Sequence, residues 1–470
     1  MVRPAQAARP GLALAIIVTC QLMLMLDATV MNVALPRIRA DLGFSTTGLA
    51  WVLNAYTLVF GGLLLLGGRA GDLFGRRKLF LGGVALFTAA SLFGALADSA
   101  GWLVLARVLQ GLGAAAAGPN TLALITSTFT EARDRVKALS VFSGVASAGF
   151  AIGLIVGGLL TESLSWRAVL FINLPFGVAI LALAPRFIRE PARHPARLDL
   201  PGALTATAGV ASLVYGFIRA ASAGWSDTRA LLALALGVAL LVVFVLVEVR
   251  TREPLMPLRL FADRNRAAGY VNFFLGPMAM MSAFFFLTQF LQEVSGYGSL
   301  VTGFAFLPLA AALFTVSRLI PRWLPAHGPK PFAIAGTVLM ALGIVWLTLL
   351  TPSTGYVPGL LGPMIVLGVG GGLAFSPQNV VIMSTVRPAD AGAAGGVLQT
   401  MQQVGSTLGL AVLVTVAGSA SRSTAAAGGS PTDALVDGMT AAFAVAAVIL
   451  ALTVAVAASL RRLPSRSTAR

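Results

Sequence analysis

The hydrophobic positions of this chain form long, almost uncharged runs, which are separated by short polar segments rich in arginine and glycine. A helix needs about twenty apolar residues to cross the hydrocarbon core of a bilayer. Fourteen runs approach this length, and they fall into a group of six, a pair and a second group of six: 12–34, 48–67, 79–97, 101–123, 138–160, 168–184; 202–221, 230–249; 267–290, 299–317, 331–350, 357–375, 393–417 and 436–459. The pattern predicts an all-α polytopic membrane protein with fourteen transmembrane helices arranged as 6+2+6.

The order of these runs divides the chain into bundles and connecting segments. We expect one six-helix bundle over residues 12–185 and a second over 267–460, with two linker helices over 202–249 between them. The remaining segments are the amino-terminal stretch 1–11, a loop at 186–201, a basic loop at 250–266 and a tail at 461–470.

The distribution of basic residues predicts the orientation of the chain in the membrane. An even number of spans places both termini on one side, and an excess of Lys and Arg marks the cytoplasmic side. Most of the 33 basic residues fall into loops on the side of the termini. The loops of the opposite side hold only six of them: Arg37, Arg39, Arg167, Arg219, Arg229 and Arg422. We therefore expect both termini to be cytoplasmic.

The composition excludes a soluble protein. Hydrophobic residues make up 57% of the chain, charged residues only 11%, and the mean hydropathy is +0.88, which a soluble domain could not bury. The formal charge of +16 would suggest nucleic acid for a soluble chain. Here the basic residues lie in short loops between apolar runs, so we expect them to face lipid headgroups, with no nucleic-acid partner.

The sequence offers no catalytic or cofactor chemistry. None of the three lysines, Lys78, Lys137 and Lys330, lies in the Gly-x-x-x-x-Gly-Lys-Ser/Thr pattern that holds ATP phosphates. The two histidines lie singly in loops without metal-ligand spacing, and the loops are too short for an enzymatic domain. We expect no enzyme activity, no metal, no cofactor and no ATP, and an ion gradient as the energy source.

The polar segment between the second and third runs is a charged hairpin. Its glycines let the chain turn and the helix ends approach, and its clustered arginines favour the cytoplasmic side. The hairpin resembles the cytoplasmic loop signature of the major facilitator superfamily through these residues: Gly68, Arg69, Asp72, Gly75, Arg76 and Arg77. The resemblance implies a gate in which Asp72 bridges helix ends or pairs with Arg69 or Arg76 in one access state. The alternative is a charge cluster that only sets topology.

Further stretches resemble one group within that superfamily, the fourteen-span drug:proton antiporters. The matching stretches touch nearly the whole chain: 26–36, 51–56, 107–113, 165–175 and 199–202. The stretch 107–113 resembles the motif that this group associates with proton transfer. The resemblance implies two helical bundles that rock around a central cavity and export drugs or antibiotics in exchange for protons.

The fifth run carries regularly spaced glycines that resemble the antiporter motif of the same group. They are Gly149, Gly153, Gly157 and Gly158, while Leu154 stands where the motif prefers proline. Glycine lets helices pack at close range and slide as the bundles move. Ordinary tight packing explains them equally well.

Two ionisable residues lie deep within the predicted spans. Asp27 lies in the first run and Arg107 in the fourth. Burying a charge in a membrane is costly, so such groups usually serve transport. Desolvation favours the neutral carboxyl, which makes Asp27 a candidate to carry a coupling proton or to accept a lipophilic cation; the structural alternative is a carboxyl that bonds only to Thr29, Asn32 or a buried water. Arg107 stays charged, and we expect it to act on Asp27 through water; hydrogen bonding to helix carbonyls is the structural alternative.

Uncharged polar and aromatic residues at helix depth are candidates to line a substrate cavity. They are Asn32, Asn54, Gln110, Asn173, Phe285, Phe286 and Gln289. Phenylalanines offer stacking surface and amides offer weak orientation to varied ligands. Residues 284–286 are three adjacent phenylalanines that point in three directions, so we expect at least one to face lipid. For each amide alone, a helix-packing hydrogen bond is the alternative.

These observations and the resemblance together predict a proton-coupled exporter of lipophilic drugs or antibiotics in a bacterial inner membrane. Its partners would be the lipophilic substrate, protons and membrane lipids, and we expect it to act as a monomer. Two alternatives stay open. One is a dedicated exporter of a single metabolite or amphiphile, and the other is a non-transporting sensor or assembly factor on the same fold.

Overall fold

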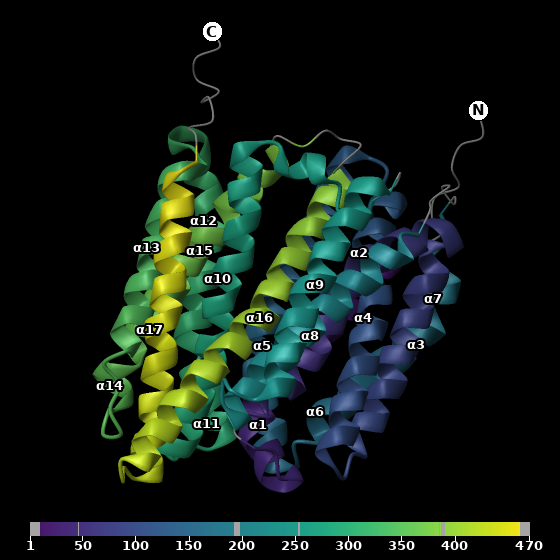
Figure 1. The fold of residues 1–470 in the computed structure, drawn as a ribbon. Helices are drawn as coiled ribbons and strands as arrows, with labels where there is room; N and C mark the ends of the chain where they lie inside the picture. The colour runs from purple at the N-terminus through teal and green to yellow at the C-terminus, as the bar shows by residue number, and fades with distance from the viewer. Residues whose placement is uncertain are drawn as a thin grey trace, which may run out of the picture.

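The computed structural model describes residues 10–45, 47–191, 198–251, 254–384, 386 and 391–460. In these residues the chain is helical, and the helices run roughly parallel as two bundles joined by an inserted helix pair (Figure 1). Thirteen stretches are long and apolar enough to cross a membrane, which makes the chain a multi-pass membrane protein. The predicted segments 1–11 and 461–470 lie almost wholly outside the described residues, as does the middle of the loop 186–201, residues 192–197.

The first bundle uses residues 10–187. Its helices are α1 (Pro10–Leu42), α2 (Ala50–Phe74), α3 (Arg76–Ala95), α4 (Ala100–Thr128), α5 (Ala132–Ser163), α6 (Ala168–Phe171) and α7 (Asn173–Phe187). Helices α6 and α7 form one span, Ala168–Phe187. Gly75 separates α2 from α3 at φ +109°, a conformation that favours glycine, so the chain turns sharply there.

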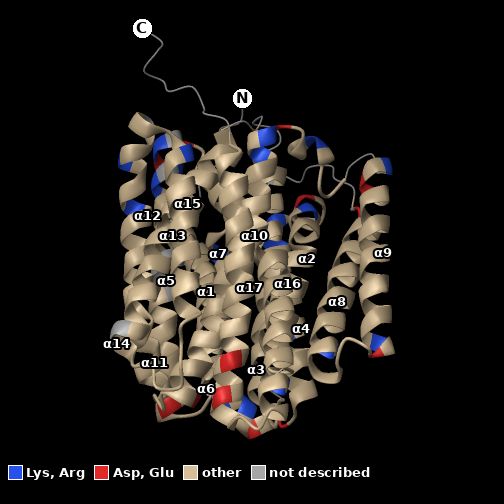
Figure 2. Cartoon of the chain, turned by 60° about the vertical axis from the view of Figure 1, so that its left-hand side comes forward, with Lys and Arg blue, Asp and Glu red and all other residues tan. Residues whose placement is uncertain are grey.

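The inserted pair consists of α8 (Leu200–Ala223) and α9 (Thr228–Arg250). An aspartate caps the start of each helix: Asp199 accepts a hydrogen bond from the amide of Gly202, and Asp227 from that of Ala230. Helix α9 lies at the edge of the molecule (Figure 2) and exposes most of its side chains, as expected of a helix that faces lipid. Helix α8 packs against α9 and also against α2 and α16, so it touches both bundles.

The second bundle begins after a short 3₁₀ turn, η1 (Leu258–Phe261). Its helices are α10 (Arg264–Gln289) with the π-helical extension η2 (Phe290–Val294), α11 (Ser299–Ala305), α12 (Leu307–His327), α13 (Pro329–Leu347), α14 (Tyr356–Gly359), α15 (Leu361–Ser384), α16 (Ala391–Ala426) and α17 (Pro431–Ala458). Helix α10 is the most buried span, because α16, α17, α15 and α1 surround it.

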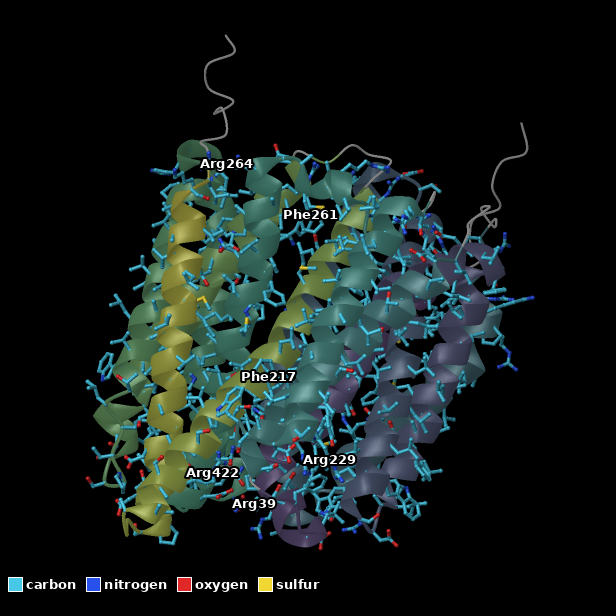
Figure 3. The ribbon with its side chains drawn as sticks, viewed as in Figure 1. Arg39, Phe217, Arg229, Phe261, Arg264 and Arg422 are labelled. Atoms are coloured by element: carbon cyan, nitrogen blue, oxygen red, sulfur yellow. The ribbon has the colours of Figure 1, made fainter. Side chains whose placement is uncertain are left out.

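The two ends of the molecule differ in charge. Lys and Arg gather at the end where α1 begins and α17 ends, whereas the acidic residues are more prominent at the opposite end (Figure 2). We call these the terminal end and the far end. Arg264 lies at the terminal end, and Arg39 and Arg422 lie at the far end (Figure 3).

Candidate functional site

A buried ion pair lies in the middle of the first bundle. Arg107 on α4 donates from one guanidinium nitrogen to Oδ2 of Asp27 on α1 at 2.6 Å, and the two side chains are 1% and 0% exposed. Arg107 also donates to the carbonyl oxygen of Val52 on α2 at 2.9 Å. Its guanidinium lies 4.4 Å from the ring centroid of Tyr56. The expected coupling through water is therefore wrong, because the pair is in direct contact.

Amide side chains complete the network around Asp27. Gln110 on α4 and Asn173 on α7 each donate to its other oxygen, Oδ1, at 3.0 Å. Both amides also donate to the hydroxyl of Ser91 on α3, at 2.8 and 3.3 Å. The carboxylate thus accepts from three side chains, and this charge-assisted set offsets the cost of burying the ion pair.

This arrangement makes the bonding of several helices depend on one proton. A protonated Asp27 would carry no charge to hold Arg107, and one of its oxygens would become a donor. Arg107 would then keep only the carbonyl of Val52, the amide oxygen of Gln110 at 2.8 Å and the Tyr56 ring. Because α1, α2, α4 and α7 meet here, protonation would change contacts among all four helices.

The occupied carboxylate bears on the second role considered for Asp27. Both of its oxygens already accept hydrogen bonds from buried side chains. A lipophilic cation could bind Asp27 only by displacing Arg107 or the two amides. The geometry therefore favours a proton over a cationic ligand as the partner of this carboxylate.

Helix α1 continues past Asp27 into contact with α10 of the second bundle. Asn32 donates to the hydroxyl of Thr288 at 3.3 Å, and Gln292 donates to the carbonyl of Val33 at 2.9 Å. At the far end, a guanidinium nitrogen of Arg39 lies 2.7 Å from a carboxylate oxygen of Glu293 on η2. These contacts join the two bundles along one edge of α1, up to the far end.

Several buried amides lack partners in the part of the chain that the structure describes. Neither side-chain polar atom of Asn54, Asn272 or Gln289 accepts or donates a hydrogen bond, although each residue is 1% exposed. The side-chain amide oxygen of Asn32 also accepts no hydrogen bond from the described residues. An unsatisfied buried polar group costs about 1–3 kcal/mol, so these positions suit a water molecule or a ligand. Asn272 is not expected from the sequence; its signal there is an amide in the apolar run 267–290, which also holds Gln289.

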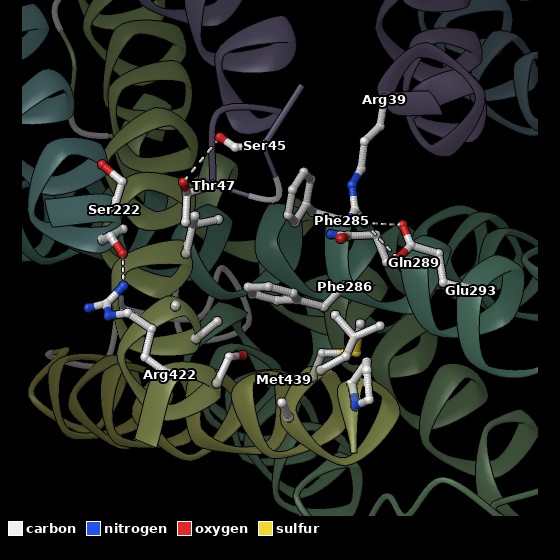
Figure 4. A pocket seen from close by; sticks show the side chains of 18 of the residues that line it. Arg39, Ser45, Thr47, Ser222, Phe285, Phe286, Gln289, Glu293, Arg422 and Met439 are labelled. Atoms are coloured by element: carbon white, nitrogen blue, oxygen red, sulfur yellow. Dashed lines mark hydrogen bonds and ion pairs between the residues drawn. The ribbon is translucent and has the colours of Figure 1, made fainter. Parts of the chain in front are cut away.

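A cavity of about 590 Å³ opens beside α10 at the far end. Phe285, Phe286 and Gln289 form one wall. Across from them lie Thr47, between α1 and α2, and Arg422 of α16 (Figure 4). The expectation that one phenylalanine of residues 284–286 faces lipid is wrong, because all three are at most 7% exposed. Phe284 stacks on Phe306, and Phe286 meets Phe443 of α17 edge to face, so neighbouring helices cover this part of α10.

The hairpin between α2 and α3 holds ion pairs at the terminal end. Arg76 donates to Oδ1 of Asp72 at 2.9 Å, so Asp72 pairs with Arg76 and not with Arg69. The amides of Arg77 and Lys78 donate to the carboxylate of Glu190 at 3.1 and 3.2 Å. Glu190 follows α7 and ties its end to the start of α3, a contact that the loop signature does not reveal. Gly68 packs near Pro119 of α4.

The glycines of α5 allow two different helices to approach. A Cβ atom on Gly153 or Gly157 would lie 1.8 Å from the Thr29 hydroxyl or 2.8 Å from Val30 Cα, both on α1. A Cβ on Gly158 would lie 2.6 Å from the backbone oxygen of Ser299, at the start of α11 in the second bundle. Gly149 has looser neighbours on α1, the nearest at 3.1 Å. Close packing thus accounts for three of the four positions.

Comparison with known proteins identifies the family. The model of the Major Facilitator Superfamily matches residues 17–410. The chain is 42% identical over 412 residues to the cephamycin export protein CmcT of Amycolatopsis lactamdurans, which covers 87% of this chain and 85% of that protein. It is 43% identical over 454 residues to the puromycin resistance protein pur8 of Streptomyces alboniger, with 94% and 90% covered.

A solved structure agrees on the fold. The crystal structure of a peptide transporter, POT, in complex with sulfate superposes with a TM-score of 0.68 at 13% identity, covering 95% of this chain and 94% of that one. At this identity the likeness speaks for the fold alone. The family match and the two relatives point to a transporter rather than an enzyme. This chain belongs to the Major Facilitator Superfamily.

Proposed function

We propose that this protein exports lipophilic drugs or antibiotics in exchange for protons, and that Asp27 carries the proton. The observation that carries the proposal is the buried carboxylate of Asp27 on α1, held by Arg107 and Gln110 of α4 and by Asn173 of α7. The names of the two relatives, a cephamycin exporter and a puromycin resistance protein, support the class of cargo.

We place the protein in a bacterial inner membrane with fourteen spans as 6+2+6. Helix α5 supplies the fourteenth span: it is 32 residues long, and its part Ala151–Ser163 is an apolar helix in its own right. The basic residues at the terminal end support a cytoplasmic location for that end (Figure 2). The far end then faces the outside of the cell.

The exchange follows from competition between two states of the Asp27 network. A proton that arrives from outside neutralises Asp27 and releases Arg107, which loosens α1 from α4 and favours one access state. Release of the proton to the cytoplasm restores the ion pair and favours the other state. A substrate that binds one state more tightly shifts this equilibrium, and the coupling is reciprocal. The proton gradient thereby drives the substrate outward.

Gates at the two ends would confine access to one side at a time. At the far end, the ion pair of Arg39 and Glu293 spans the bundles, and the amide of Leu300 donates to Glu162 at 2.7 Å. At the terminal end, the pair of Asp72 and Arg76 stiffens the hairpin between α2 and α3. Each contact is an ion pair or a charge-assisted hydrogen bond that opening could break at modest cost.

A dedicated exporter of one metabolite is the second candidate within transport. The unpartnered amides of Asn54, Asn272 and Gln289 favour it, since fixed polar groups at several depths could read one ligand closely. A non-transporting sensor is less well supported. A fully buried ion pair is costly to desolvate, and ionisable groups inside a membrane usually mark a functional site. A protein that transports nothing would have no reason to keep one.

Inverted membrane vesicles test the proposal. A proton gradient is established, and puromycin, a cephamycin and a panel of lipophilic compounds of each charge class are added in turn. We expect at least one of them to dissipate the gradient with the wild type and none with Asp27→Asn. The matched control is Asp98→Asn, which alters an aspartate outside the spans. If Asp27→Asn dissipates the gradient as well as the wild type does, Asp27 is not the proton carrier.

A further inference from the structure

The cavity beside α10 has a charge balance that the export function alone does not explain. Its charged lining residues are Arg39, Arg422 and Glu293. Arg39 donates to both oxygens of Glu293, at 2.8 and 2.7 Å, so this pair is neutral overall. Among the residues that the structure describes, Arg422 donates to the backbone oxygen of Ala221 and to the hydroxyl of Ser419 and forms no ion pair. The cavity therefore carries one positive charge that no carboxylate of the described residues balances.

The opposite wall of the cavity offers groups that suit a ring with a polar substituent. Phe285 and Phe286 line the cavity and are only 1% and 4% exposed (Figure 4). Their rings are 5.3 Å apart and nearly perpendicular, at 80°. Gln289 lies one turn further along α10 and is also 1% exposed, and both atoms of its amide lack partners. An amide that is buried, free and next to a cavity can accept or donate a hydrogen bond to a ligand.

The inserted helix pair closes the cavity on its third side. Ala221 and Ser222, near the end of α8, line it, and the guanidinium of Arg422 binds the Ala221 carbonyl. Helix α8 is thus a wall of the site as well as a link between the bundles.

We propose that this cavity binds amphipathic aromatic molecules that carry a carboxylate or another anionic group, and that α8 forms part of the binding site. The ring would lie against Phe285 and Phe286, a polar substituent would bond Gln289, and the anionic group would face Arg422. The proposal rests on the proposed function in one respect: it assigns the cavity to the export path because the cavity lies at the far end. Lipophilic cations are disfavoured here, as they are at Asp27.

A matched pair of fluorescent probes tests the charge preference. Dansylglycine and dansylcadaverine share one ring system, but the first carries a carboxylate and the second an ammonium group. Binding to the full-length protein in lipid nanodiscs is followed by dansyl fluorescence. We expect the wild type to bind dansylglycine about tenfold more tightly, since a charge-assisted contact contributes at least that factor. Equal or tighter binding of dansylcadaverine, or binding of neither probe, would overturn the proposal.

Three variants locate the site. We expect Arg422→Gln to reduce the preference for dansylglycine about tenfold, while Arg229→Gln, an arginine at the same end but outside this cavity, keeps it. Ser222→Trp fills the cavity from the exposed surface of α8 and should abolish binding of both probes. Should Arg422→Gln and Ser222→Trp both bind like the wild type, the site lies elsewhere and the assignment is wrong.

A fourth variant separates this inference from the proposed function. Asp27 does not line the cavity, so we expect Asp27→Asn to keep the preference for dansylglycine over dansylcadaverine while losing proton flux in vesicles; its affinity for both probes shifts with the access state, as reciprocal coupling requires. Normal flux in Asp27→Asn with normal probe binding would refute the proposed proton carrier and leave the cavity assignment standing. Loss of the preference for dansylglycine in Asp27→Asn would instead contradict the assignment of the probe to this cavity.

Discussion

The contact between Asp27 and Arg107 predicts a large energetic coupling between two residues 80 positions apart in the chain. Replacing Arg107 with Gln leaves a buried carboxylate with only amide donors, and replacing Asp27 with Asn leaves a buried guanidinium without its anion. Removing one partner of a buried ion pair costs about 3–5 kcal/mol. The double variant buries neither charge, so we expect it to cost about as much as one single variant. The coupling energy then equals the cost of one single variant, about 3–5 kcal/mol.

Reversible unfolding in lipid and detergent bicelles measures the four free energies of this cycle. The control is the corresponding cycle with Arg39→Gln and Glu293→Gln, whose ion pair is almost equally short, at 2.7 Å, but has side chains 32% and 24% exposed. Solvent screens that pair, so its coupling should be about 1 kcal/mol or less. If the effects of Asp27→Asn and Arg107→Gln simply add, the two side chains do not act as one unit and the switch described above is refuted.

Two further predictions concern the packing of α5 and the inserted helix pair, α8 and α9. Gly158→Ala should lower the unfolding free energy by about 1–3 kcal/mol, because its Cβ would meet the Ser299 backbone 2.6 Å away. The control is Gly144→Ala in the same helix, whose Cβ would meet nothing within 4 Å and which should be neutral or stabilising. Equal effects of the two variants on the unfolding free energy would contradict the packing argument. Hydrogen bonding from Arg219 holds the pKa of Asp227, in the turn between α8 and α9, below its ordinary value. Its contribution to stability is therefore present at neutral pH and lost as the pH falls through that lowered pKa. The melting temperatures of wild type and Asp227→Asn should differ at neutral pH and converge in acid; a gap that widens in acid would contradict this sign.

The helices themselves are largely predictable from the sequence, because crossing hydrocarbon imposes both length and composition. The run 230–249 corresponds to α9 (Thr228–Arg250), and 267–290 corresponds to α10 (Arg264–Gln289). Helix ends are less predictable, since polar residues can continue a helix beyond the membrane. Helix α1, for example, continues to Leu42, well past the apolar run that ends at residue 34.

The candidate site is predictable in its members and not in its geometry. A charge in an apolar run stands out, so the sequence identifies Asp27 and Arg107, and it also identifies Gln110 and Asn173 as polar residues at helix depth. That all four meet depends on how α1, α4 and α7 pack, which no local pattern encodes. Ser91 escapes notice because a serine in an apolar run is common and usually bonds only its own helix.

The error at residues 284–286 has a related cause. A run of apolar residues reads the same whether it faces lipid or other helices, because both surroundings are apolar. Only the position of α10 at the centre of the second bundle decides between them. The same position brings Phe285, Phe286 and Gln289 to the cavity.

The most direct test of the central claim compares exchange with uphill transport in proteoliposomes. The labelled compound is the one that gives the strongest signal in the vesicle assay. Wild type should accumulate it against its gradient when a pH difference is imposed and should also exchange it for unlabelled compound without one. The account predicts that Asp27→Asn retains exchange and loses accumulation. Accumulation by Asp27→Asn at the wild-type level would contradict the claim that Asp27 carries the coupling proton.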